Sequence, residues 1–360
     1  MKSFFFVLPL IYVGANAYLY LRTLQALTFL PSWGKVIFSV AFWIAVVALF
    51  IAVGLRETQL PGQIIQALFS VGSVWIIFCL YTVAFLAIID ILKLAIPSFG
   101  GHSIWYAIPI TCALLIYGYA NYRHPKVEQL NISLEQKSNN KKLRAVAISD
   151  IHLGYGTGIK ALERYVELIN SQKPDIVLIA GDLIDNSIKP LLDKPFDKVL
   201  NSINAPLGIY MVPGNHEYIS DINKVEKYLE KTSIVMLRDS VITLPNGVQI
   251  IGRDDRSNAK RKPLSDLISL TNREQPTIVI DHQPYKLATA DSLKVGMLLC
   301  GHTHHGQVFP LNLLTDKLYE QSHGYRKWSH THIWVSSGLS LWGPPFRIGT
   351  ISDLAVIELQ

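Results

Sequence analysis

The segment GHTHHG at residues 301–306 carries three histidines within four positions. It follows directly on an apolar run, Val295–Cys300, that predicts a buried strand. Imidazole is the commonest metal ligand in proteins, and two histidines separated by one residue in a turn can face the same point. A solvated loop with incidental histidines explains the stretch equally well. The choice therefore depends on which other residues of the chain reach this place.

Metal-binding residue types also follow four other predicted strands, at residues 144–149, 175–180, 208–212 and 276–280. These segments are short, apolar and rich in valine and isoleucine, and amphipathic stretches alternate with them. In layered α/β folds, ligands bind outside the carboxyl ends of the strands. The candidate ligands that follow the five strands are Asp150, His152, Asp182, Asn215, His282, His302 and His304.

The seven candidate ligands offer oxygen or imidazole nitrogen and no thiolate. Such a set suits two borderline or hard divalent ions, namely manganese, iron or zinc. Two ions about 3.5–4 Å apart form the clamp that is used for phosphate ester hydrolysis. One carboxylate has to bridge such a pair, and a hydroxide held between the ions is placed to attack phosphorus in line. Each motif alone occurs by chance, but the five in this order predict a two-metal site.

The same motifs carry a family resemblance. They are DIH (150–152), GDLID (181–185), GNHE (214–217), the histidine of VIDHQP (279–284) and GHTH (301–304). Together they resemble the calcineurin-like metallophosphoesterases over about residues 143–360, and the apolar first third resembles the membrane-anchored members of that family. The resemblance implies a four-layer α/β/β/α sandwich with two divalent metal ions at the strand ends.

The resemblance also implies a role for each residue. Asp182 would bridge the two ions and His216 would face the substrate, stabilising phosphoryl charge or protonating the leaving oxygen. Asp185 and Glu217 would orient ligands or His216, although capping of a loop or helix start explains them equally well. Arg347 would contact a phosphate. The implied ligands are Asp150, His152 and His304 for the first ion, and Asn215, His282 and His302 for the second.

Four further histidines stand outside this set. His305 departs from the resembled pattern, in which many members carry glycine, and its bulk would narrow the cleft or touch substrate. The pair His330 and His332 copies the spacing of His302 and His304, but it begins a strand instead of ending one. For this pair, and for His323, the sequence favours a structural or solvated role.

The first third of the chain predicts a membrane region. Of 360 residues, 50% are hydrophobic, and residues 1–122 are nearly free of charge. Each of four long apolar runs has about the 20 residues that cross a bilayer. We expect about four helices here, although the first run also resembles a cleavable signal peptide. Asp90 and Lys93 predict an ion pair at the third run's end. The runs are 4–21, 36–53, 64–89 and 104–122.

Residues 123–142 are polar and predict a linker with one short strand at Val127–Leu134, ahead of an α/β domain at 143–360. The lysines and arginines that flank the apolar runs favour a cytoplasmic domain on an integral membrane protein. The net charge is +6, but no basic cluster with interleaved aromatics occurs, so nucleic acid is not an expected partner. The three cysteines form no CxxC pair, which argues against a zinc ribbon.

Two functions of different classes fit these observations. The first is a membrane-anchored two-metal phosphoesterase that hydrolyses a phosphate mono- or diester, with a lipid-linked substrate inferred from location alone. The second is a membrane sensor or transporter whose phosphoesterase-like domain regulates without turnover. The intact ligand set and the presence of His216 favour the enzyme.

Overall fold

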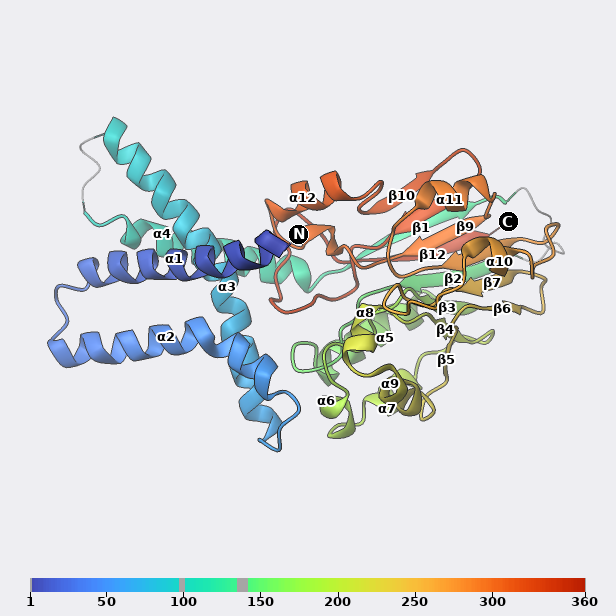
Figure 1. Ribbon diagram of the computed structural model, residues 1–360, viewed down its shortest axis with the longest axis horizontal. Helices are drawn as coiled ribbons and strands as arrows, with labels where there is room; N and C mark the ends of the chain where they lie inside the picture. Colours follow the sequence, from blue (N-terminus) through green and yellow to red (C-terminus); the bar gives the residue numbers. More distant parts are fainter. Residues whose placement is uncertain (1, 97–100, 135–141, 360) are drawn as a thin grey trace. The chain divides into compact units, whose positions relative to one another are not determined.

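The computed structural model describes residues 2–96, 101–134 and 142–359, which divide into two compact units (Figure 1). The first unit comprises residues 1–120 with 343–345, and the second comprises residues 121–342 with 346–360. We call them the helical unit and the sheet unit.

The helical unit is built from four helices. Among the described residues, three are long and apolar enough to cross a membrane, namely α2, α3 and α4. Large apolar side chains such as Leu10 of α1, Ile51 of α2 and Leu94 of α3 are exposed, which is typical of a lipid-facing surface. The first predicted run also forms a helix, and four spans remain a prediction. The bounds are α1 Lys2–Ala26, α2 Ser32–Leu55, α3 Gly62–Ala95 and α4 Ile104–Tyr122.

Asp90 pairs with Arg22 and not with Lys93. Nη2 of Arg22 donates to Oδ1 of Asp90 at 2.9 Å, and Oγ of Ser103 donates to the same oxygen at 2.5 Å. Lys93 donates instead to the carbonyl of Gly101. The predicted ion pair between Asp90 and Lys93 was therefore wrong, because Arg22 on α1 contacts this carboxylate instead.

The sheet unit contains two six-stranded sheets (Figure 1). In spatial order, the first holds β1 (Lys126–Ile132), β12 (Asp353–Leu359), β2 (Leu143–Ile148), β3 (Ile176–Ile179), β4 (Ile209–Met211) and β5 (Ile234–Met236). The second holds β10 (Gly324–Lys327), β11 (His332–Val335), β9 (Met297–Cys300), β8 (Thr277–Ile280), β7 (Gln249–Gly252) and β6 (Ser240–Thr243).

The alternation of side chains along the strands builds the four layers. Ala145 and Ala147 of β2 lie in a core that also holds Ile278 and Ile280 of β8, so the two sheets pack face to face. The opposite face of the first sheet packs against α5, α7 and α9, and that of the second against α10 and α11. The predicted α/β/β/α sandwich is confirmed.

Short helices connect the strands and cover the sheets. Helix α5 has the predicted amphipathic face, with Leu162, Tyr165, Val166 and Ile169 buried. The bounds are α5 Ile159–Ser171, α6 Lys189–Leu192, α7 Phe196–Leu200, α8 Asn215–Ile219, α9 Ile222–Leu229, α10 Leu264–Ile268, α11 Leu287–Ser292, the 3₁₀ helix η1 His304–Gly306 and α12 Leu311–Leu318.

The segment predicted as a linker is partly structural. Strand β1 pairs in parallel with β12 along all seven of its residues, from Lys126 to Ile132. Ile132 is buried in the core between the two sheets. The sheet unit therefore begins before Leu143, and the short strand expected here is its edge strand. Residues 135–141 of the predicted linker lie outside the described residues.

Candidate metal centre

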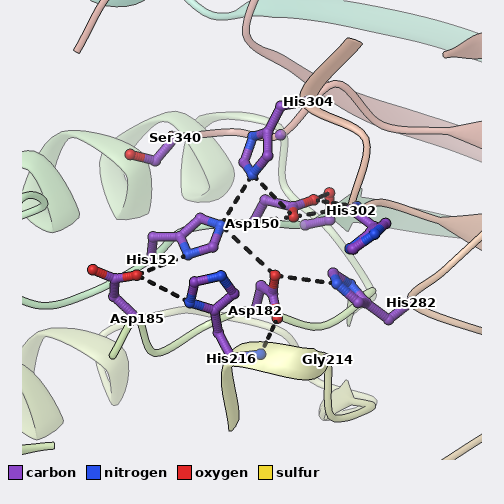
Figure 2. A network of polar contacts seen from close by, with 12 residues as sticks. Asp150, His152, Asp182, Asp185, Gly214, His216, His282, His302, His304 and Ser340 are labelled. Carbon is purple, nitrogen blue, oxygen red and sulfur yellow. Dashed lines mark hydrogen bonds and ion pairs between the residues drawn. The ribbon is translucent and has the colours of Figure 1, made fainter. Parts of the chain in front are cut away.

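The predicted ligands converge because the strands that carry them are parallel. Strands β2, β3 and β4 run in parallel in one sheet, and β8 and β9 do so in the other. Their carboxyl ends therefore meet at one edge of the sandwich. Figure 2 shows the side chains that follow these strands pointing toward one another.

Three overlapping groups of possible ligand atoms form at this edge, and two of them consist of predicted ligands alone. In the first, Nε2 of His304 lies 3.1 Å from Nε2 of His152 and 3.5 Å from Oδ1 of Asp150. In the second, Nε2 of His282 lies 3.1 Å from Oδ2 of Asp182, and His302 belongs to the same group. Within each group, one ligand atom from each residue lies within 4.8 Å of the others.

Asp182 connects the two groups. Its Oδ2 lies 3.8 Å from Nε2 of His152 and 3.1 Å from Nε2 of His282. Its Oδ1 accepts the backbone N–H of His216 at 2.9 Å, which fixes the carboxylate plane. Oδ1 of Asn215 lies 3.2 Å from Nε2 of His282 and so reaches the second group. The place of Asp182 between the two groups is the one that the resemblance implies for a bridging carboxylate.

The donor chemistry fits two divalent cations. Asp150 and Asp182 are at most 2% exposed, and buried carboxylates are costly unless positive charge compensates them. The imidazole nitrogens face each other and these carboxylates, and no thiolate is among the donors. Oxygen and imidazole donors of this kind bind manganese, iron or zinc.

The backbone around the ligands adopts a conformation that side chains rarely take. Five of the seven predicted ligands have positive φ, between 48° and 74°. Such strain persists only where the surrounding fold holds it, and it concentrates at functional sites. A Cβ at Gly214 would collide with the Asp182 carboxylate, and one at Gly301 with that of Asp150. These two glycines therefore allow the chain to approach the ligands closely. The strained ligands are Asp150, His152, Asp182, His302 and His304.

Glu217 supports the bridging carboxylate from behind. It is fully buried and accepts the backbone N–H groups of Asp182, Ile184 and Gly214 at 2.7–3.0 Å. The bond from Gly214 also caps the start of α8, so the capping role and the supporting role coexist. Burial, followed by the charge of Asp182, raises the pKa of Glu217 to about 7.

His216 lies beside the first group and is held by Asp185. Oδ1 of Asp185 lies 3.1 Å from Nδ1 of His216 and 3.5 Å from Nδ1 of His152 (Figure 2). The ring of His216 meets the ring of His152 edge-on at 4.6 Å. Because Nδ1 of His216 faces this carboxylate, Nε2 is the nitrogen left to meet another group.

The environment sets the protonation of the histidines. Burial lowers the pKa of His302 to about 4 and that of His304 to about 3, so both are neutral at pH 7 and offer a lone pair. For His152, burial opposes the charged form, but Asp150 and Asp185 raise the pKa to about 10. Cations bound at this centre would displace that proton.

Arg347 holds the backbone of the centre in place. It is fully buried, and its guanidinium donates to the carbonyls of His304, Ser337, Gly338 and Ser340. The bond to His304 is 2.7 Å long. A guanidinium committed to four carbonyls has no approach to solvent, which argues against the substrate contact expected from the sequence.

Two aromatic residues that are not among the predicted site residues lie near the predicted ligands. The ring of Trp342 lies 6.2 Å from that of His216, and the ring of Tyr319 lies 6.4 Å from that of His302. Neither residue follows a strand or belongs to a recognisable motif. Of the other histidines, His332 lies at the start of β11, and its Nδ1 is 2.7 Å from Oη of Tyr325.

Several known proteins are similar to this chain. Residues 143–306 match the family model of the calcineurin-like phosphoesterases. An uncharacterized metallophosphoesterase of Helicobacter pylori is 33% identical over 67% of this chain and 65% of its own length. A Campylobacter jejuni metallophosphoesterase, also uncharacterized, is 29% identical over 99% of this chain and 98% of its own length.

A transmembrane protein with a metallophosphoesterase domain from Danio rerio is 32% identical over 71% of this chain and 62% of its own length. The predicted resemblance is thereby confirmed, including its membrane-anchored type. Residues 143–306 of the chain form a domain of the calcineurin-like phosphoesterase family.

Proposed function

We infer that this protein is a membrane-anchored, two-metal phosphoester hydrolase. One observation carries the inference: seven oxygen and imidazole ligands from five strand ends converge on one edge, with His216 beside them. The family supports hydrolysis of a phosphoester in general. The metal requirement, the residue roles and the substrate type are our proposals.

The ions, when bound, supply the nucleophile and offset the charge of the phosphoryl group. Asp150, His152, His304 and Asp182 would hold the first ion. Asn215, His282 and His302 would hold the second together with Asp182.

His216 would act on the substrate itself. Asp185 fixes its Nδ1, so Nε2 is directed to a phosphoryl oxygen or to the leaving oxygen, to which it would give a proton. Glu217 keeps the Asp182 backbone in its strained conformation by accepting its N–H.

A basic pocket lies next to the residues that would hold the second ion, and it is evidence that the substrate is anionic. The pocket has a volume of about 510 Å³ and is lined by Arg253, Arg256, Arg261 and Lys286 among others. Gln283, the residue after the ligand His282, also lines it. Its lining within the described residues contains no carboxylate. Asp281 pairs with Arg253 and Arg261, so Arg256 and Lys286 are the cations left to favour a substrate with anionic groups beyond the scissile phosphate.

The exposed leucines of helix α12 are evidence that the substrate is presented at a bilayer. The helix begins five residues after Gly306, and its leucines at 311, 313, 314 and 318 are 46–65% exposed. No residue of this helix is buried. An exposed apolar helix beside the ligand loop, in a chain with apolar spanning helices, favours lipid-linked phosphoesters over freely soluble ones.

The catalytic test uses the full-length protein in detergent. After chelation, hydrolysis of bis-p-nitrophenyl phosphate and p-nitrophenyl phosphate is measured with manganese, iron or zinc returned. We expect metal-restored hydrolysis, and the ratio of the two rates gives the diester or monoester preference. Folded protein that hydrolyses neither compound with any metal would favour the sensor or transporter alternative.

The lipid preference has its own test. Leu313→Ser combined with Leu314→Ser should lower hydrolysis of phosphatidic acid in mixed micelles several-fold and leave hydrolysis of p-nitrophenyl phosphate unchanged. Leu192→Ser, at a leucine that is 56% exposed on α6, is the matched control. Equal loss on both substrates would argue against a role of α12 in lipid presentation.

We also infer a cytoplasmic sheet unit from the charges that flank the apolar runs. A green fluorescent protein fused after the C-terminus should fluoresce, and alkaline phosphatase at the same place should be inactive. The reverse pattern would place the sheet unit on the other side of the membrane.

A further inference from the structure

A second cluster of metal-binding side chains lies outside the centre described above. Nε2 of His305 is 3.3 Å from Oδ1 of Asp316, and Nδ1 of His323 is 3.9 Å from the same oxygen. One ligand atom from each of the three residues lies within 4.8 Å of the others. The three come from η1, from α12 and from the segment after α12, so the fold and not a local repeat brings them together.

An unpartnered buried nitrogen points into this cluster. His305 is only 9% exposed, and its Nε2 has no hydrogen-bond partner within the described part of the chain. Buried polar atoms in proteins are normally hydrogen-bonded, so an unpaired one usually marks a missing ligand. A cation bound by the neighbouring carboxylate and imidazole would satisfy it.

The backbone fixes His305 in this orientation despite a conformational cost. His305 has φ 47°, a region that glycine adopts far more readily. Its backbone N–H is held at 3.1 Å by Oγ1 of Thr303, and Gly306 packs directly against the start of α12. The strain therefore aims the imidazole at α12, whereas the adjacent ligand His304 faces His152.

The donor set matches a zinc-type ion. Two imidazoles and one carboxylate, with a fourth position for water, form a common arrangement around zinc. Bonds of about 2.0–2.1 Å in tetrahedral geometry separate neighbouring ligand atoms by about 3.3 Å. The separations of 3.3 and 3.9 Å are close to this value. The two rings stack at 3.5 Å between centroids with 16° between their planes, so the exposed His323 would have to rotate out of the stack before both nitrogens could bind one ion.

We propose that His305, Asp316 and His323 bind a third divalent ion of the zinc type, separate from the two-metal centre. This ion would clamp α12 onto the loop that carries His302 and His304, and so hold the apolar helix beside the centre. Metal binding replaces the structural or solvated role predicted for His323. It also accounts for the presence of histidine at position 305, where many members of the resembled family carry glycine. The proposal concerns metal binding and stands whether or not the chain hydrolyses phosphoesters.

The test is the metal content of the full-length protein in detergent. Wild type, Asp316→Asn, His323→Ala and His305→Gly are equilibrated at the same buffered free zinc concentration, and ions per chain are measured by mass spectrometry. Asp316 and His323 have side chains 44–45% exposed, so neither change should impair folding, and a thermal melt checks this. His330→Ala, at an exposed histidine outside the cluster, is the matched control.

We expect wild type and His330→Ala to bind one ion per chain more than the three cluster variants. Zinc should also raise the melting temperature of wild type by a larger amount than that of Asp316→Asn. Equal metal content in wild type and in the folded cluster variants would overturn the proposal, and the cluster would then be a hydrogen-bonding network only.

Discussion

Oδ1 of Asp185 lies 3.1 Å from Nδ1 of His216, and it lies 3.5 Å from Nδ1 of His152. One carboxylate thus orients both a predicted metal ligand and the residue that would act on the substrate. Partners of this kind fix the tautomer and direction of an imidazole, and their removal typically costs about 10- to 100-fold in metal affinity or activity.

Asp185→Asn should therefore lower kcat for bis-p-nitrophenyl phosphate by about 10- to 100-fold while the protein remains folded. Amide and carboxylate have the same shape, so the loss would come from charge and hydrogen bonding. Steady-state kinetics in saturating manganese measure the effect. The control is Asp193→Asn, at an exposed carboxylate, which should leave kcat unchanged. An Asp185→Asn enzyme with wild-type kcat would leave Asp185 with a capping role only.

His216→Gln separates catalysis from metal binding. If Nε2 of His216 gives a proton to the leaving oxygen, kcat should fall by roughly 10²- to 10⁴-fold. The ions per chain should stay the same, because His216 is not among the proposed ligands. His216 does lie within ligand distance of His152 and Asp182, so loss of one ion in this variant would identify it as a ligand instead.

Substitution of Arg347 should lower the stability of the fold and leave the affinity for substrate unchanged. Arg347→Met leaves four buried carbonyls without their donor, and each unsatisfied buried group costs about 1–3 kcal/mol. We expect a melting temperature lower by several degrees and an unchanged KM in the folded fraction. Arg326→Met, at an exposed arginine on β10, serves as control. A raised KM with an unchanged melting temperature would restore the substrate contact that the sequence favoured.

The pKa of His302 predicts an acid sensitivity of the metal-free protein. The folded-state pKa is about 4, well below the ordinary 6.5, because burial disfavours the charged ring. The unfolded chain thus binds a proton before the folded one does. The stability contributed by this residue is complete above pH 6.5 and is lost as pH falls toward 4.

Thermal melts in EDTA between pH 6.5 and 4.5 measure this sensitivity. The melting temperature of wild type should fall further over this interval than that of His302→Gln, because the variant lacks the titrating ring. Identical losses in both proteins would show that His302 is not held neutral by the fold.

The sequence allowed prediction of those features that depend on strand order and residue type. A ligand such as Asp182 or His282 directly follows an apolar strand, and parallel strands bring their carboxyl ends together. The four layers were predicted only through the family resemblance, because the strands are continuous apolar runs and do not show which face packs against helices. The roles of Asp185 and Glu217 were foreseen only as one of two alternatives, since capping and support use the same carboxylate.

Features that depend on distant contacts could not be predicted. Asp90 was paired with a lysine one turn away because helix spacing is visible in a sequence, whereas the approach of Arg22 on another helix is not. The burial of Arg347 and the edge strand β1 also depend on tertiary packing. The contact of His305 with Asp316 and His323 needs the turn of η1 and the packing of α12 at once.

The most direct test of the two-metal account is Asp182→Asn, because this one carboxylate connects both ligand groups. Full-length wild-type and variant proteins are stripped by chelation, and hydrolysis of bis-p-nitrophenyl phosphate is followed as manganese is returned. The account predicts that hydrolysis returns in wild type and remains at least 10³-fold lower in folded Asp182→Asn, a loss on the order of 4 kcal/mol in transition-state stabilisation. Equal metal-restored rates in the two proteins would contradict it.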